Sequence, residues 1–595
     1  MIIRQIGRGG FRVGSRNEGG RMESHGQLPG RRWGFWPELR PRRGNRRGRR
    51  HPARLIAVAA VVTLAAAACG SSGSGSSVKN GGVFRLGSNS SIDSLNPFVA
   101  FQADAYVTFE YIYPMLVQYN PQLQFVPDFA TNWSESQDGK VWTFHTHAGA
   151  KWSDGKPLTA ADAAWTYSTI LKYQDGPTAN SAGYVAHMKS ATAPNATTLV
   201  LTYKQPVANV LSQMQQTPIL PEHVWAKYAT GNGKALTRFT NNAPIVSGGP
   251  FILTKYTPKQ IVLFKRNPVF YGTKPHVDGL GLQFFQTTDA MITALKSHQL
   301  DGVETVTPTS VATLKAAHFV VPSSPGVVFD DFIINANPQQ EASHKELMNP
   351  LVRQAFDAAI NRQAIVSTSL LGHGKPGSSI IPPATGHWFD PAIKPTAFSL
   401  TKANQLLDQA GYKMGANGVR MANGHPMSYT VIMPTDIQNT YGQRSFQIIQ
   451  PAFKKIGVQL NLKVLDASAA YDAITANDYK NFELSMWDWY PLSDPDFMLS
   501  VLTCVTWNTW NDTGYCSKTY DSLYQAQSAA TTPAKRQQIV YQMQQMIASQ
   551  RIYLVLDYPD TIEAHSPAWT DLPLVAGISW NSMSKIPFES VHQAG

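Results

Sequence analysis

The sequence has few cysteines and lacks the common motifs of catalysis. It has three cysteines in 595 residues, too few for a disulfide-dense scaffold or a cysteine-rich metal cluster. It contains no G-x-x-x-x-G-K-[ST] phosphate loop, no H-E-x-x-H zinc motif and no C-x-x-C pair. These absences argue against P-loop nucleotide hydrolysis, zinc peptidase chemistry and thiol–disulfide exchange. The sequence predicts no catalytic residue, no metal site and no cofactor.

Residues 55–595 carry no formal net charge, although the whole chain carries +12. Residues 1–54 hold 15 of the 51 Lys and Arg residues and three of the 39 Asp and Glu residues, which leaves 36 of each for residues 55–595. A nucleic-acid-binding surface needs basic residues gathered on a folded face. The distribution therefore argues against nucleic acid as a partner.

An apolar run follows the Arg-rich leader of residues 1–54. Residues 55–68 are 14 uncharged residues, fewer than the roughly 20 that span a bilayer as a helix. A basic segment followed by a short apolar run is the layout of a secretory signal peptide, so we expect export. Cys69 follows, ahead of a Gly/Ser-rich tether at residues 70–81. Residues 55–69 resemble the leader of a bacterial lipoprotein, which implies lipidation of Cys69 on the outer face of the cytoplasmic membrane. The alternative is a plain signal peptide with a chance cysteine.

The other two cysteines are Cys504 and Cys516. An even pair of close cysteines in an exported protein indicates a disulfide. Closing so short a loop stabilises a fold by about 3 kcal/mol on the loop-entropy model. The alternative is a pair of buried free thiols.

Residues 126–170 predict a compact strand–turn–strand–turn–helix unit. The turn at Asp138-Gly139 precedes an alternating strand at residues 141–147. Thr159 is a helix N-cap, with Asp162 in the first turn, where the helix dipole favours an acid. His145 and His147 share one face of the strand and could ligate a metal, but a solvated strand face is favoured.

This stretch resembles the extracytoplasmic solute-binding protein family 5, the peptide- and nickel-binding components of ABC importers. The matching residues, in order, are Pro127, Ala130, Trp133, Asp138, Gly139, Trp142, Phe144, Gly149, Lys151, Trp152, Asp154, Gly155, Pro157, Leu158, Thr159, Ala160 and Asp162. Residues 266–271, 349–362, 403–412 and 483–499 also resemble family segments, so the resemblance covers residues 82–587.

The resemblance implies an α/β fold like that of the periplasmic binding proteins (type II, cluster C), with two lobes, a hinge and an extra small subdomain. We expect the first lobe at residues 82–330, with the subdomain inserted at about 119–240. The second lobe then spans residues 331–555, and residues 556–595 return to the first. Local patterns agree, since strands and helices alternate over residues 429–464. A helix is also expected at residues 104–116.

Aromatic and acidic residues gather at a predicted strand end within residues 483–499. Aromatic rings offer apolar area with a polar handle, and acids pair with amines. The predicted ligand-binding residues are Trp487, Asp488, Trp489, Tyr490 and Asp494. The alternative for the aromatic rings is an ordinary lobe core. In peptide-binding members an Asp three residues before the Asp-Pro pair grips the peptide amine. That position is Pro491 here, and Asp488 is the candidate replacement.

The resemblance implies a receptor that binds a small solute, with an oligopeptide or dipeptide as the expected solute. It would deliver the solute to an ABC permease in the membrane, with ATP hydrolysed on separate subunits, and we expect a monomer in the cell envelope (periplasmic space). The alternatives are a nickel chelate, opine or sugar as solute, or an exported hydrolase or signalling module on the same fold.

Overall fold

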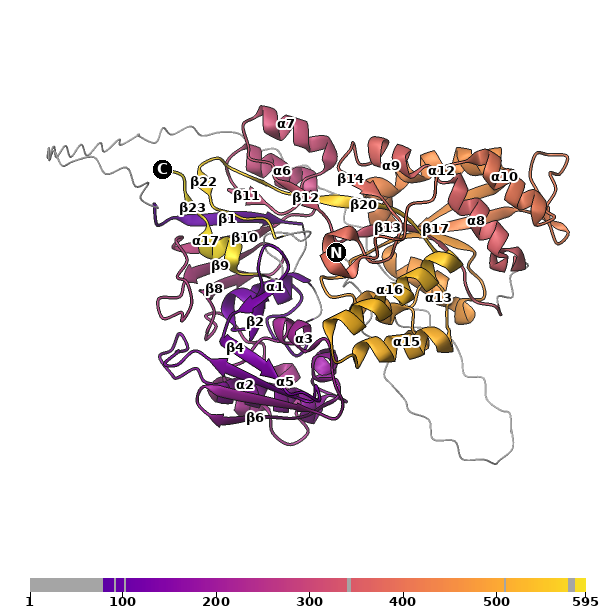
Figure 1. Cartoon of the computed structure of the whole chain (residues 1–595). Helices are drawn as coiled ribbons and strands as arrows, with labels where there is room; N and C mark the ends of the chain where they lie inside the picture. Colours follow the sequence, from indigo (N-terminus) through magenta and orange to yellow (C-terminus); the bar gives the residue numbers. More distant parts are fainter. Residues whose placement is uncertain (1–78, 90–91, 101–102, 340–343, 508–509, 576–583) are drawn as a thin grey trace, which may run out of the picture. The chain divides into compact units, whose positions relative to one another are not determined.

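The structure is a computed structural model that describes residues 79–89, 92–100, 103–339, 344–507, 510–575 and 584–595 (Figure 1). The predictions for the leader, the apolar run, Cys69 and the greater part of the tether lie outside these residues. Among the described helices, none has both the length and the apolar composition that crossing a membrane requires.

A six-stranded sheet forms the centre of the first lobe. Its order is β21-β11-β1-β10-β9-β8. The first strand of the lobe, β1, runs parallel to both of its neighbours, and the hairpin β8–β9 closes one edge. The other edge is β21, which comes from the C-terminal part of the chain. The strands are β1 (Val83–Ser88), β8 (Phe251–Thr257), β9 (Ile261–Arg266), β10 (Gly279–Phe284), β11 (Gly302–Val303) and β21 (Ala564–His565).

The first lobe carries a separate four-stranded antiparallel sheet of order β4-β5-β7-β6. Helix α2 packs against β6 and β7. The predicted N-cap is confirmed: the Thr159 side chain accepts from the Ala161 N–H at 3.3 Å, and Asp162 accepts from the Thr159 N–H at 2.9 Å. This capping box satisfies N–H groups that the first helical turn leaves unpaired. The elements are β4 (Ala130–Glu135), β5 (Val141–Thr146), α2 (Ala160–Tyr173), β6 (Met188–Asn195) and β7 (Thr198–Tyr203).

The remaining elements of the first lobe are short. Helix α1 ends at Ile112, four residues before the predicted end, because Pro114 has no N–H to continue the helix. The elements are α1 (Ala103–Ile112), β2 (Val117–Tyr119), β3 (Phe125–Pro127), α3 (Val210–Gln216), α4 (Glu222–Trp225), α5 (Lys234–Arg238), α6 (Thr288–Lys296), α7 (Val311–Ala316), β22 (Trp569–Thr570), α17 (Ile586–Ser590) and β23 (His592–Gln593).

A seven-stranded sheet forms the second lobe. Its order is β12-β20-β13-β19-β17-β18, and β14 also pairs with β20. Strands β17, β18 and β19 are mutually parallel, as expected for strands joined by helices. The strands are β12 (Ser323–Pro325), β13 (Phe329–Ile334), β14 (Gly374–Pro376), β17 (Ser428–Pro434), β18 (Gln459–Leu465), β19 (Leu484–Trp489) and β20 (Tyr553–Ile562).

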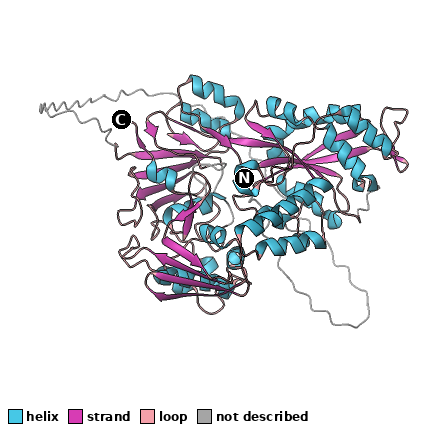
Figure 2. Ribbon diagram, in the orientation of Figure 1, coloured by secondary structure: helices cyan, strands magenta, loops and turns pink. Residues whose placement is uncertain are grey.

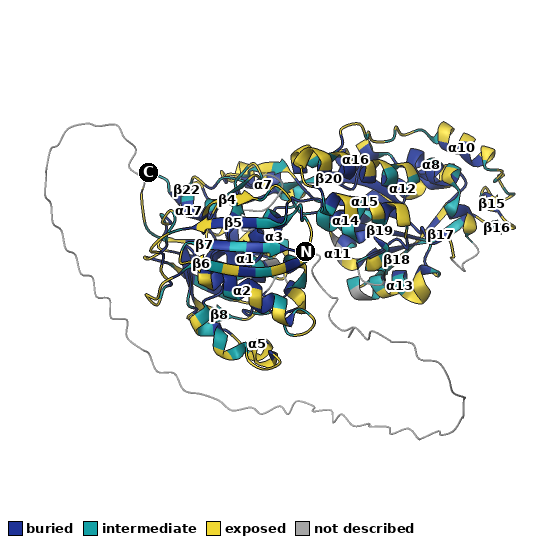
Figure 3. Cartoon of the chain, turned by 60° about the horizontal axis from the view of Figure 1, so that its bottom comes forward, coloured by how far each residue is buried: buried dark blue, intermediate teal, exposed yellow. Residues whose placement is uncertain are grey.

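Helices cover both faces of this sheet, so each face has its own core (Figure 2). One core joins α8, α10 and α12 to the sheet, and the other joins α14, α15 and α16. Because both faces are covered, all six residues of β13 are buried, two aspartates included. Figure 3 shows the buried residues of the chain in dark blue. The helices are α8 (Pro350–Ala359), α9 (Arg362–Thr368), α10 (Leu400–Gln409), α11 (Thr435–Ile437), α12 (Gln443–Lys455), α13 (Ala467–Tyr479), α14 (Asp496–Val501), α15 (Lys518–Ser528) and α16 (Pro533–Gln550).

The chain passes between the two sheets twice. It leaves the first sheet after β11 and enters the second through β12. It returns along β20, whose last residues pair with β12 before β21 joins the first sheet. Two antiparallel segments therefore connect the lobes.

Candidate ligand-binding site

Three aspartates meet on one face of the second lobe's sheet. Asp330 of β13 lies directly opposite Asp488 of β19 and Asp557 of β20. Residues that face each other across antiparallel strands project to the same side of the sheet. Asp330 and Asp557 are fully buried at 0% exposure, and Asp488 is half-buried. We call these three residues the carboxyl cluster, and Asp488 is its solvent-accessible member.

Burial determines the protonation of this cluster. Burial, and next the charge of Asp557, raise the pKa of Asp330 well above its usual range. Burial also raises the pKa of Asp557 to about 7, while a hydrogen bond with Asp330 and the charge of Arg362 oppose the rise. Apart from Asp330, Asp557 has no hydrogen-bond partner among the described residues. Asp330 and Asp557 therefore keep their protons to a higher pH than an ordinary aspartate does.

A second pair of buried acids lies on the opposite face of these strands: Asp331 belongs to β13, and Asp512 belongs to the loop before α15. The Trp489 Nε1 donates a hydrogen bond of 2.9 Å to Asp512, and the Tyr553 hydroxyl donates to its other oxygen. Burial raises the pKa of Asp512 to about 7 despite these bonds. Burial, followed by the charge of Asp512, raises the pKa of Asp331 well above its usual range. This pair lies within the core on the side of α14 to α16.

The two predicted tryptophans belong to that same core. Trp487 is 7% exposed and Trp489 is 5% exposed, and both pack in the cluster that contains Tyr553. Because the Trp489 ring nitrogen is already bonded to Asp512, its polar handle faces inward. The placement favours the alternative of an ordinary lobe core for these two rings, and they support β19 from behind Asp488.

The predicted acid at Asp494 is engaged within the lobe. Its two oxygens accept from Arg536 Nη1 at 2.8 Å and Nη2 at 2.7 Å, and both side chains are buried. The pair ties the loop after β19 to α16, so its charge is already neutralised. Tyr490 is half-buried beside Val327 and Val575. Of the five predicted residues, only Asp488 joins the carboxyl cluster.

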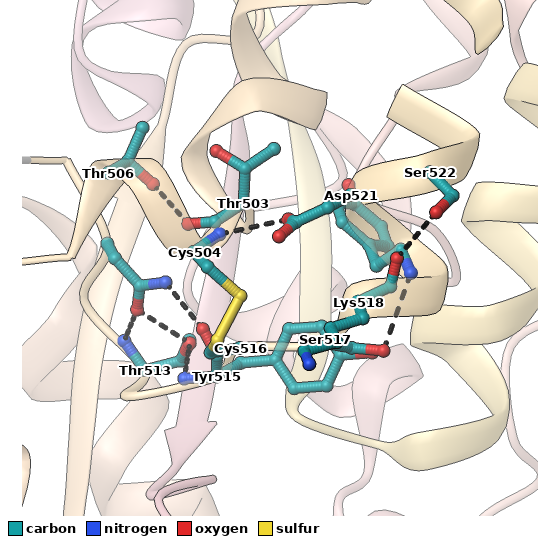
Figure 4. The surroundings of a disulfide bond; sticks show 12 residues. Thr503, Cys504, Thr506, Thr513, Tyr515, Cys516, Ser517, Lys518, Asp521 and Ser522 are labelled. Carbon is teal, nitrogen blue, oxygen red and sulfur yellow. Dashed lines mark hydrogen bonds between the residues drawn. A yellow bond between two sulfur atoms is a disulfide. The ribbon is translucent and has the colours of Figure 1, made fainter. Parts of the chain in front are cut away.

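The structure joins Cys504 to Cys516 in a disulfide (Figure 4). Cys504 follows α14, and its N–H donates to the Asp521 carboxylate at 3.0 Å. Cys516 immediately precedes Ser517, whose side chain caps α15. The disulfide therefore holds the loop after α14 against the first turn of α15.

Sequence reasoning missed the partners of Asp488. Asp330 and Asp331 are consecutive acids within the apolar segment 327–334, and Asp557 ends the apolar run 552–556. Acids inside buried strands are unusual and signal a functional or structural demand. Nothing local shows that Asp330 and Asp557 face Asp488, because that depends on strand order and register.

Comparison with known proteins identifies the class. The sequence profile described as bacterial extracellular solute-binding proteins, family 5 (middle region), matches residues 124–509. The chain therefore belongs to this family of solute-binding proteins, and the expected membership is confirmed.

Relatives and solved structures extend the likeness beyond the matched region. Protein XP55 of Streptomyces lividans is 27% identical over 501 residues, which is 82% of this chain and 85% of that protein. The Helicobacter pylori ABC transporter-associated binding protein DppA, solved with the peptide STSA, has a TM-score of 0.69 at 22% identity and covers 87% of this chain and 99% of its own. The Campylobacter jejuni protein NikZ, solved with Ni(L-His), has a TM-score of 0.72 at 18% identity and covers 86% and 99%. These likenesses confirm the periplasmic-binding-protein-like two-lobe α/β fold.

Proposed function

We propose that this protein is the receptor of an ABC importer and that it binds short peptides. Its family binds solutes outside the cytoplasm, and a structural neighbour was solved with a peptide. The carboxyl cluster supports a ligand that carries a cation, because deprotonated acids in a low-dielectric site pair strongly with an ammonium group. Binding occurs without catalysis in this proposal.

Asp488 is the residue through which the ligand amine would enter the cluster. It is the half-buried member, whereas Asp330 and Asp557 are fully buried. A bound ammonium would lower the raised pKa values of Asp330 and Asp557 and release protons from them. Trp487, Trp489 and Asp494 would hold the strand and the following loop in place. Tyr490 is the half-buried aromatic residue next to the cluster in the chain.

The delivery route completes the proposal. The solute would pass to a membrane permease with separate ATPase subunits, and closure of the two lobes would follow from tighter binding of the solute to the closed form.

Lipidation at Cys69 would anchor a monomeric receptor on the outer face of the cytoplasmic membrane. Metabolic labelling with a fatty-acid probe, compared between the parent and Cys69→Ala, tests the anchor.

A nickel chelate is the second candidate solute, because NikZ shares the fold and was solved with Ni(L-His). The ligand screen described in the next paragraph separates the two candidates, because each predicts that its own solute stabilises the receptor.

The decisive experiment is a thermal-shift and calorimetric screen of the purified mature protein. The probes are free-amine tripeptides and tetrapeptides, the same peptides acetylated at the amine, and nickel–histidine. A ligand at 100 times its Kd stabilises the folded state by about 2.7 kcal/mol. We expect the free-amine peptides to raise the Tm and the acetylated peptides to have little effect.

Asp488→Asn tests the assigned contact. Loss of a charged hydrogen bond costs about 1.5–3 kcal/mol, so the Kd should rise roughly 10- to 100-fold. The control is Asp175→Asn, which changes an exposed acid on the first lobe. Equal binding of free and acetylated peptides would rule out Asp488 as an amine site. A shift with nickel–histidine alone would favour the second candidate.

A further inference from the structure

Two histidines and a glutamate meet at one edge of the second lobe. His344 precedes a single 3-10 turn at Lys345–Met348, Glu346 lies in that turn, and His425 begins strand β16 (His425–Pro426). One nitrogen or oxygen atom of each residue lies within 4.8 Å of those of the other two, and among the described residues this is the one group of three or more His, Cys, Asp or Glu side chains with that spacing. We call these three residues the His–Glu cluster.

Glu346 is the buried centre of this cluster, with a side-chain exposure of 0%. One carboxylate oxygen accepts from the Tyr429 hydroxyl at 2.8 Å and lies 3.0 Å from His344 Nδ1. The other oxygen accepts from Asn423 Nδ2 at 3.2 Å and lies 3.6 Å from His425 Nε2. Two neutral donors therefore fix the carboxylate between two imidazoles.

The far nitrogen of His344 is also fixed. His344 Nε2 lies 2.8 Å from a carboxylate oxygen of Glu483, and the other Glu483 oxygen accepts from the Thr430 backbone N–H. A carboxylate on the second nitrogen is the usual partner of a histidine that ligates a metal, because it sets the tautomer and ring orientation. The His344 and His425 rings are 4.7 Å apart at 85°, so their edges converge on Glu346.

We propose that the His–Glu cluster is a binding site for Zn²⁺ or another late first-row dication, with His344 Nδ1, a Glu346 oxygen and His425 Nε2 as ligands. Imidazole with carboxylate suits Zn²⁺, Ni²⁺ and Cu²⁺, whereas Ca²⁺ and Mg²⁺ require oxygen ligands. Ligand atoms around a tetrahedral Zn²⁺ are roughly 3.3 Å apart. His344 Nδ1 lies 3.0 Å from one Glu346 oxygen and His425 Nε2 lies 3.6 Å from the other, so each imidazole nitrogen is near that spacing from the carboxylate. Three protein ligands leave one position for water.

The same residues offer an alternative to a metal, namely a proton. Without an ion, the hydrogen bond to Glu346, and next that to Glu483, raise the pKa of His344 to about 9. His344 is then a cation between two acids. A metal must displace this proton, so metal binding and the protonated pair are mutually exclusive states of one cluster.

This site is separate from the carboxyl cluster. Val431 of β17 pairs with Leu484 of β19 in parallel register. Tyr429 precedes Val431 by two residues and Asp488 follows Leu484 by four, so about six residues of strand, or roughly 20 Å, separate the two sites. A metal here would link the turn before α8 to the β15–β16 hairpin (β15, Met421–Ala422) and to β17, and would stabilise the lobe without touching the proposed peptide site.

The test is calorimetric titration of tag-free, EDTA-stripped full protein with Zn²⁺ alone and Ni²⁺ alone. We expect one site per chain, a Tm that rises with metal, and at least a tenfold weaker affinity in His425→Gln. Glu483→Gln should weaken binding about 10- to 100-fold through its effect on His344. His145→Gln is the matched control, because it removes an exposed histidine on β5 of the first lobe. Asp488→Asn should leave metal affinity unchanged.

Two outcomes would overturn the proposal. One is the absence of stoichiometric binding of either ion. The cluster would then serve only as an ion pair between protonated His344 and its two glutamates. The other is binding that survives both His425→Gln and His344→Gln. Should the variants fail to fold, a crystal of the parent grown with Zn²⁺ decides. An anomalous peak between the three residues supports the site, and its absence there refutes it.

Discussion

The carboxyl cluster predicts that the protein loses stability as the pH rises. Burial raises the pKa of Asp557 to about 7, whereas an Asp in an unfolded chain titrates near 3.9. Between these values the folded state binds more protons than the unfolded chain. The free energy of unfolding therefore falls through that range.

The magnitude follows from the shift. A rise of about three pKa units corresponds to roughly 4 kcal/mol at 1.36 kcal/mol per unit. Because pH 5 already lies above the unfolded value, the loss between pH 5 and pH 8 is roughly 3 kcal/mol for Asp557. Asp330 has a raised pKa for the same reason and adds to the loss.

Asp557→Asn should remove this dependence. An amide does not titrate, and its NH₂ can donate to Asp330, which lowers the pKa of that acid as well. We expect the variant to be as stable as the parent or less stable at pH 5 and clearly more stable at pH 8. Urea unfolding at both pH values measures this, with Asp175→Asn as the exposed control. An equal loss in parent and variant between pH 5 and pH 8, or a parent that gains stability, would refute the reasoning.

Two further predictions concern the second lobe. Replacing both Cys504 and Cys516 by Ser should lower the free energy of unfolding by about 3 kcal/mol, because the unfolded chain regains the freedom that the closed loop removed. Thermal unfolding of the oxidised parent and of the variant tests this, and equal Tm values would contradict it. Arg536→Met should cost about 3–5 kcal/mol by leaving the Asp494 carboxylate buried and unpaired. Adding Asp494→Asn should recover part of that loss, as measured by urea unfolding. A double variant less stable than Arg536→Met alone would show that the unpaired Asp494 charge is not the cause.

Local elements could be predicted from the sequence because their signals lie within a few residues. Thr159 and Asp162 indicate the start of α2, and the structure has that capping box. The alternation of strand and helix predicted over residues 429–464 is confirmed by β17, α12 and β18. The predicted end of α1 was wrong, since Pro114 ends that helix earlier than its apolar spacing suggests.

The site was less predictable because it depends on non-local register. Trp487, Asp488 and Trp489 are adjacent in sequence, yet strand alternation sends Asp488 to one face and both rings to the other. Which face lies against helices follows from the strand order, and no pattern in residues 483–499 contains that order. Likewise His344 and His425 come together only because the chain between them folds back.

The way the chain returns to its first lobe has a consequence for biogenesis. The Phe84 ring packs against Trp569 at 5.2 Å and Phe588 at 5.9 Å, and Lys585 forms a buried ion pair with Asp128. The amino-terminal lobe therefore lacks part of its core until the final segment of the polypeptide has emerged. A chain exported amino-terminus first can complete its second lobe while the first is still open. Exported intermediates should then expose that unfinished core to chaperones and proteases, and a nascent chain that stops short of Trp569 should be degraded even though most of its residues are present.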